Sequence, residues 1–153
     1  MDVFENISID SLLEYWSQVR KSIRDCLNAT PTGLLSWAPK EGMRTLGQLY
    51  VDLATSIDWW LTTAFNEDDN RPPSSRHSTE DRNYLDRHLE QSFERLERFL
   101  GIANLSEMYE SRGRKLRGAW IVLHMFKQDI YHQAQIIDYL RQNGIDPPIS
   151  DMI

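Results

Sequence analysis

The sequence is poor in cysteine, with Cys26 alone among 153 residues, so no disulfide can form within the chain. No apolar run approaches the roughly 20 residues that a membrane-spanning helix requires. The first ten residues, MDVFENISID, are acidic and lack the basic and then apolar order of a secretory signal. With no indication of an oxidising compartment or a bilayer, we expect a cytoplasmic protein with no membrane partner.

Positive charge is also scarce. The formal net charge is −6, whereas binding to nucleic acid needs a concentrated basic face, so we expect no nucleic-acid partner. The local exception is Arg112-Gly113-Arg114-Lys115-Leu116-Arg117. In the simpler interpretation this run is a solvated loop, and in the other it attracts a small anionic molecule.

The composition that is present fits one globular domain, which we expect to span residues 1–153. Four segments carry an apolar period of 3.6 residues and predict helices. They run from about Ser8 to Asn28, from Thr45 to the breakers at Asn66 to Pro73, from near Ser78 to Gly101, and from about Leu116 to Asn143. The pattern indicates an all-α four-helix bundle with long crossover connections at Ala29 to Arg44 and Asn66 to His77. The polar connection from Asn104 to Lys115 has room for a short hairpin but shows no clean strand alternation.

The last predicted helix has two apolar sectors rather than one. Val122 and Phe126 belong to the first sector, and Ile121 and Met125 to the second. A helix of this kind is either central in its bundle or faces a second subunit, so a homodimer is one expectation.

A polar file runs beside the second sector and consists of His124, Gln128, His132 and Gln135. Spacings of four, four and three residues keep these side chains on one side of the helix. In the simpler interpretation the histidines are core-edge imidazoles bonded to side chains, backbone or water. In the other, His132 is a metal ligand helped by the residue one turn earlier. That residue is Gln128, whose neutral amide oxygen binds zinc poorly.

Two stretches of the chain follow recognisable patterns. LHMFKQDIYHQAQIIDYLRQNGIDPP, residues 123–148, is similar to H-x-x-x-H-R-G-Q-I followed by L-R, G and P-P, with Gln128 in place of the first His. TLGQLYVDLATSIDWWL, residues 45–61, is similar to the pattern of a hydroxyl residue, an aliphatic residue, Gly, apolar residues, His, an acidic residue and aromatics, with Asp52 in place of the His. In both respects the sequence resembles the DinB/YfiT-like family, and the resemblance covers nearly the whole chain. Gln133 and Ala134 depart from the family's Arg and Gly.

The resemblance implies a four-helix bundle that is frequently a homodimer. It also implies a divalent metal, typically zinc or nickel, held by three histidines. Those positions are Asp52, Gln128 and His132 here, and only His132 keeps its residue type. A carboxylate at Asp52 would also suit manganese or iron. Asp129 is our alternative third ligand, because a carboxylate and an imidazole three residues apart serve as ligands in di-iron bundles.

Two functions remain open at this point. Characterised relatives include thiol transferases and thiol-dependent isomerases, in which a metal lowers the pKa of a bound thiol. The first reading is therefore a metal-dependent thiol transferase or hydrolase-like enzyme, with an anionic thiol as cosubstrate. The second is a non-catalytic or weakly metal-binding homodimer with a degenerate metal site and an unknown small-molecule ligand. Cys26 is a poor nucleophile in either, because it lies on an amphipathic helix with no histidine near it.

Overall fold

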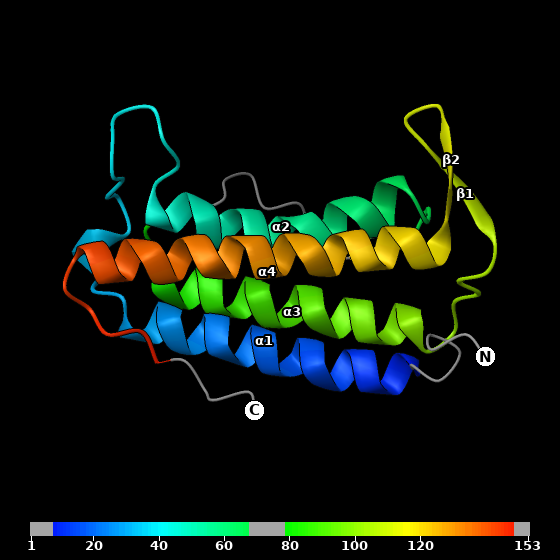
Figure 1. Cartoon of the computed structure of the whole chain (residues 1–153), viewed down its shortest axis with the longest axis horizontal. Coiled ribbons are helices and arrows are strands. Elements are labelled where there is room, and N and C mark those ends of the chain that lie inside the picture. Colours follow the sequence, from blue (N-terminus) through cyan, green and yellow to red (C-terminus); the bar gives the residue numbers. More distant parts are fainter. Residues whose placement is uncertain (1–7, 68–78, 149–153) are drawn as a thin grey trace, which may run out of the picture.

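The computed structural model describes residues 8–67 and 79–148. In these ranges the chain forms α1 (Ile9–Ala29), a 3-10 turn η1 (Thr32–Leu34), α2 (Leu46–Thr63), α3 (Arg82–Leu100), β1 (Met108–Ser111), β2 (Arg114–Arg117) and α4 (Gly118–Gln142). The four helices lie side by side along one axis, and the β-hairpin projects from one end of the bundle (Figure 1). The expected all-α four-helix bundle is confirmed. None of the described helices is long and apolar enough to cross a membrane.

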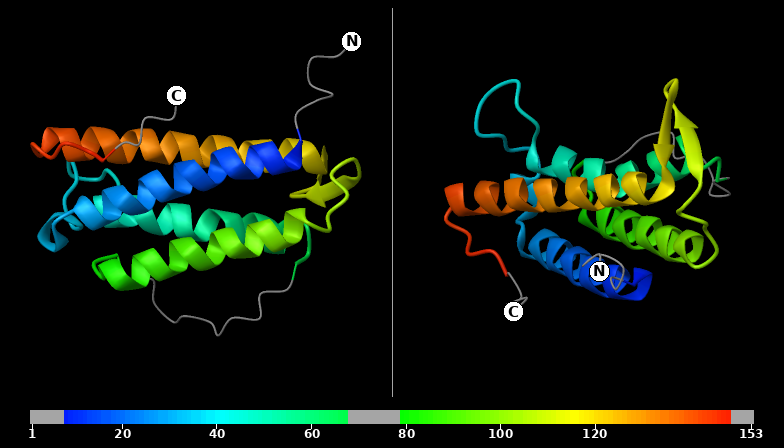
Figure 2. Two further views of the ribbon diagram at one scale, coloured as in Figure 1. Left: turned by 90° about the horizontal axis from the view of Figure 1, so that it is seen from below. Right: turned by 45° about the vertical axis from the view of Figure 1, so that its right-hand side comes forward.

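Helices α2 and α3 run in the same direction (Figure 2). His88, in the first half of α3, lies beside Asp58 of α2, with 3.3 Å between His88 Nε2 and Asp58 Oδ2. Arg95, toward the end of α3, bonds to Thr62 at the end of α2. The end of α2 and the start of α3 therefore lie toward opposite ends of the bundle, and the order is not up-down-up-down. The crossover expected from the long connection is confirmed.

The second helix starts where the sequence predicted. The Thr45 hydroxyl accepts a hydrogen bond from the Gln48 amide at 3.1 Å, and the Gln48 side chain accepts one from the Thr45 amide at 2.8 Å. This capping box satisfies two backbone donors that the first turn leaves free. The third helix begins later than expected, at Arg82, with Asp81 as its N-cap. Ser78, predicted near its start, lies outside the described residues.

The fourth helix also begins later than predicted, because residues 114–117 form a strand. The register pairs Met108 with Arg117 and Ser111 with Arg114. Arg112 and Gly113, with φ of 52° and 73°, form the two-residue turn between the strands, and positive φ at both positions matches the twist of a tight hairpin. The segment that lacked clean alternation in the sequence is thus a hairpin.

Both apolar sectors of α4 are used inside the chain. Ile121 and Met125 of the second sector are 0% and 2% exposed, and Val122 of the first is 1% exposed. The helix packs against both α1 and α2. The two apolar sectors of α4 allowed either a central place in the bundle or a contact with a second subunit. The structure places α4 centrally, and these two sectors leave no large apolar face for a partner.

Candidate functional site

A pocket of about 610 Å³ opens between α2, α4 and the hairpin. Its lining combines aromatic rings, arginines and the polar file of α4. The lining residues are Asp52, Thr55, Ser56, Trp59, Trp60, Ser111, Arg112, Arg114, Leu116, Trp120, His124, Gln128 and His132. All three residues that the family resemblance placed at the metal, Asp52, Gln128 and His132, are in this set, so the fold brings these positions to one cavity.

The Asp52 carboxylate is already paired. Arg44 donates hydrogen bonds to both of its oxygens, from Nε to Oδ2 at 3.0 Å and from Nη2 to Oδ1. The loop that carries Arg44 is fixed on α4 by the Tyr139 hydroxyl, which donates to the Arg44 carbonyl at 3.0 Å. The Tyr139 ring in turn packs edge to face on Trp37. Contacts around the loop therefore direct the guanidinium at Asp52.

The two α4 positions are bonded to neighbours as well. Gln128 Oε1 accepts a hydrogen bond from Trp60 Nε1 at 3.4 Å, and Gln128 Nε2 lies 3.2 Å from Nε2 of His124. His132 Nδ1 lies 3.0 Å from Gln135 Oε1. The amide oxygen of Gln128 is thus an acceptor for an indole. The polar file satisfies itself in the way that the simpler interpretation of the two histidines described.

His124 is the aromatic centre of the pocket. Burial and the nearby charge of Lys127 lower the pKa of His124, which favours the neutral imidazole. Its ring is parallel to Trp120, with centroids 5.1 Å apart and 7° between planes, and meets Trp60 edge to face at 5.4 Å. Residue spacing alone predicts His124 as part of a polar file and does not reveal these stacking partners.

Asp129, the alternative third ligand, is not among the lining residues. Its fully buried carboxylate accepts hydrogen bonds from Trp16 Nε1 at 2.6 Å and from Arg20 at 2.7 and 3.1 Å. Arg20 also donates to the Leu53 carbonyl at 3.0 Å and to the Ser92 hydroxyl at 3.4 Å. One ion pair therefore joins all four helices. A signal for this buried ion pair is present in the sequence, because Arg20 stands on the apolar face of its helix, four residues after Trp16.

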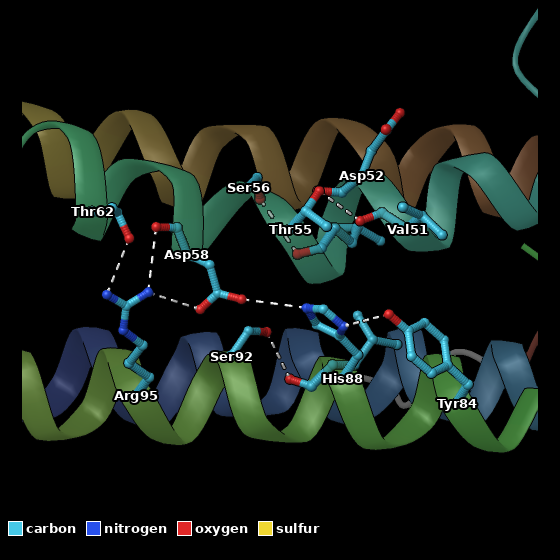
Figure 3. A network of polar contacts seen from close by, with 12 residues as sticks. Val51, Asp52, Thr55, Ser56, Asp58, Thr62, Tyr84, His88, Ser92 and Arg95 are labelled. Atoms are coloured by element: carbon cyan, nitrogen blue, oxygen red, sulfur yellow. Dashed lines mark hydrogen bonds and ion pairs between the residues drawn. The ribbon is translucent and has the colours of Figure 1, made fainter. Parts of the chain in front are cut away.

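A second polar network lies on the other side of α2 (Figure 3). Asp58 accepts hydrogen bonds from Arg95 at 3.1 Å and pairs with His88 at 3.3 Å. In Figure 3 Asp52 points away from this network, although both aspartates belong to α2. Asp58, His88 and Arg95 are each at most 15% exposed, and the network ties α2 to α3 rather than lining the pocket.

Cys26 does not line the pocket and is fully buried. Burial, with a smaller contribution from the Asp25 charge, raises the pKa of its thiol to about 11. The thiolate is the reactive form of cysteine, and very little of it exists near pH 7 at this pKa. Cys26 is therefore a core residue, in agreement with the sequence-based expectation.

The donor set fits zinc or nickel poorly. Across residues 8–67 and 79–148, no three side chains of His, Cys, Asp or Glu lie close enough to hold a metal ion. At the family's three positions the donors are one imidazole, one carboxylate bonded to Arg44 and one amide bonded to Trp60. Zinc and nickel favour imidazole nitrogen and thiolate over a neutral amide.

Comparison with known proteins identifies the fold family. Comparison with functionally curated proteins gives no match. A DinB-like protein from Bacillus cereus ATCC 10987 superposes with a TM-score of 0.76 at 18% identity, covering 92% of this chain and 95% of that one. The DinB-like protein YjoA from Bacillus subtilis gives a TM-score of 0.69 at 14% identity, covering 87% and 92%. The model of the DinB family matches residues 1–153, and the chain therefore belongs to the DinB family.

Proposed function

We propose that this protein is a DinB-family bundle with a degenerate metal site, whose pocket binds a small molecule without metal-dependent catalysis. The observation that carries the proposal is the pairing of Asp52 with Arg44 through both carboxylate oxygens. A metal ion at Asp52 would have to compete with a guanidinium that is already fixed there. Gln128 gives no compensation, because its neutral oxygen is a weak ligand and accepts from Trp60.

One observation favours the alternative, a divalent-metal-dependent thiol transferase or hydrolase-like enzyme. Asp52, Gln128 and His132 line a single pocket, as the three ligands of a metal would have to. Zinc, nickel, manganese and iron are the candidate ions. The two functions separate by metal affinity, which can be measured before any substrate is known.

We expect protein purified without a histidine tag to contain far less than one equivalent of zinc, nickel or manganese. Elemental analysis and titration with each metal in turn test this directly. Replacing Gln128 with histidine places a second imidazole one turn before His132, so zinc and nickel affinity should rise on the order of tenfold or more. The same substitution in a His132→Ala background is the matched control and should show little of the gain. Near-stoichiometric tight binding by the unmodified protein, lost in His132→Ala, would favour the enzyme instead.

We also propose that the chain forms a homodimer through the outer face of α4. Leu123 and Tyr131 are eight residues apart on that helix and are 56% and 60% exposed. Large exposed apolar side chains on one helix are candidates for a contact between two copies of the chain. Sedimentation at micromolar concentration should give a dimer, and a Leu123→Glu/Tyr131→Glu variant should give a folded monomer. A monomer for the unmodified protein would contradict the proposal.

A further inference from the structure

The aromatic part of the pocket is built from three indoles and one imidazole. Trp59 and Trp60 meet edge to face with centroids 4.9 Å apart, and Trp120 stacks on His124. Trp59 and Trp120 nevertheless remain 38% and 46% exposed. A rigid aromatic surface that is held in place by its neighbours but still reaches solvent is well suited to stacking on another flat ring.

The hairpin brings positive charge to the same pocket. Arg112 and Arg114 flank Gly113 at the turn, and the Arg112 guanidinium lies 4.7 Å from the centroid of the Trp59 ring. Within the described parts of the chain, neither arginine forms an ion pair with a carboxylate. The register pairs Arg114 with Ser111 and leaves Arg112 in the turn, and both arginines line the pocket.

The charge of these two arginines is not compensated locally. Asp52 is the only acidic side chain among the described lining residues, and both of its oxygens are bonded to Arg44. His124, which also lines the pocket, carries no negative charge that could pair with the arginines. On a chain with a formal net charge of −6, a pocket with unpaired arginines beside exposed indoles is a local reversal of sign that favours an anionic ligand.

We infer that the pocket binds a flat aromatic ring that carries an anionic group such as a carboxylate. The ring stacks on the exposed indoles of Trp59 and Trp120, while the anionic group accepts hydrogen bonds from Arg112 and Arg114. The volume of about 610 Å³ lies within the range of small-molecule sites. This inference rests on the proposed function, because at a metal-loaded site the ion would itself be the main attraction for an anion.

Three probes separate ring from charge in calorimetric titrations of the full-length protein with EDTA present. They are 2-naphthoate, its neutral analogue 2-naphthamide, and cyclohexanecarboxylate, an anion without an aromatic ring. We expect 2-naphthoate to bind about tenfold or more tightly than either other probe, and to bind more weakly as salt is added. Equal affinity for all three probes, or no binding of 2-naphthoate at millimolar concentration, would overturn the inference.

Variants at the exposed lining residues then assign the contacts. Arg112→Gln/Arg114→Gln and Trp120→Ala should each weaken 2-naphthoate binding by about tenfold. Arg87→Gln/Arg98→Gln and Tyr15→Ala replace exposed side chains outside the pocket and should leave it unchanged. Unaltered melting curves confirm that the variants are folded. Binding that survives the Arg112/Arg114 substitutions would overturn the inference.

The two proposals fail in different ways. If 2-naphthoate binds only after zinc or nickel is supplied, the proposed metal-independent function is wrong and the inference that rests on it is overturned. If the protein binds no metal tightly and does not distinguish the three probes, the inferred ligand class is wrong while the degenerate metal site stands.

Discussion

Replacing Asp129 with asparagine is expected to lower the free energy of unfolding by about 3–5 kcal/mol. The carboxylate is fully buried and accepts hydrogen bonds from Trp16 and from two nitrogens of Arg20. Asparagine would leave the Arg20 guanidinium, which is 3% exposed, without a counter-ion. An unpaired charge in a low-dielectric core costs more than the intact pair contributes, so loss of one partner is the damaging change.

The matched control is Asp25→Asn, because Asp25 forms an ion pair of the same length with Lys21, but at the surface. Both pairs measure 2.7 Å, while Lys21 and Asp25 are 71% and 36% exposed. Exposed pairs contribute up to about 1 kcal/mol, so the control should be nearly neutral. Urea unfolding measures both variants. An Asp129→Asn protein as stable as Asp25→Asn would contradict the structural role.

The same experiment bears on Asp129 as a metal ligand. If the only role of Asp129 is to pair with the Arg20 charge, the Asp129→Asn variant should lose the same stability with and without EDTA. If Asp129 were a metal ligand, part of the stability loss of Asp129→Asn would appear only when metal is present, since a bound ion stabilises the native state by mass action. Replacing both partners together, as Arg20→Met/Asp129→Leu, should recover most of the loss because no buried charge remains.

Local signals in the sequence were enough to predict the helices. The Thr45 capping box and the C-terminal turn at Gly144, with φ of 71°, stand where the sequence placed them. Each depends on residues within a few positions of one another, and each satisfies backbone groups at a helix end. The sequence left room for the hairpin but did not predict its strands, because Arg112-Gly113 is not one of the common Asn-Gly or Asp-Gly turns and the short strands are mostly exposed.

The candidate site was predicted only in part. The fold resemblance placed Asp52, Gln128 and His132 together, and the structure brings them to one pocket. Their partners could not be read from spacing, because Arg44 reaches Asp52 through a loop conformation fixed by Tyr139 on another helix. A partner set by tertiary packing leaves no periodic trace in the sequence.

Replacing Gly47 with alanine is expected to destabilise the protein by about 2–3 kcal/mol or more. In an exposed helix this change would stabilise by roughly 1 kcal/mol, because glycine is the poorer helix former. Here an added Cβ would lie 1.9 Å from the Thr79 carbonyl oxygen and 2.9 Å from that of Leu35. Both contacts are to backbone, which cannot turn aside as a side chain would. The Gly47 amide also donates to the Leu35 carbonyl at 2.8 Å, so relief of the clash would strain that bond.

Gly33→Ala is the control for this prediction, because an added Cβ at Gly33 would meet nothing within 4 Å. That variant should be as stable as the unmodified protein or slightly more so, since alanine restricts the unfolded chain. Urea unfolding of both variants should therefore give effects of opposite sign or very different size. If Gly47→Ala matched Gly33→Ala, the segment at Thr79 would not approach α2 as closely as the structure places it. A loss of stability confined to Gly47→Ala would instead show that α2 requires glycine where it meets the backbone of Leu35 and Thr79. This contact lies close to the loop that carries Arg44, the partner of Asp52.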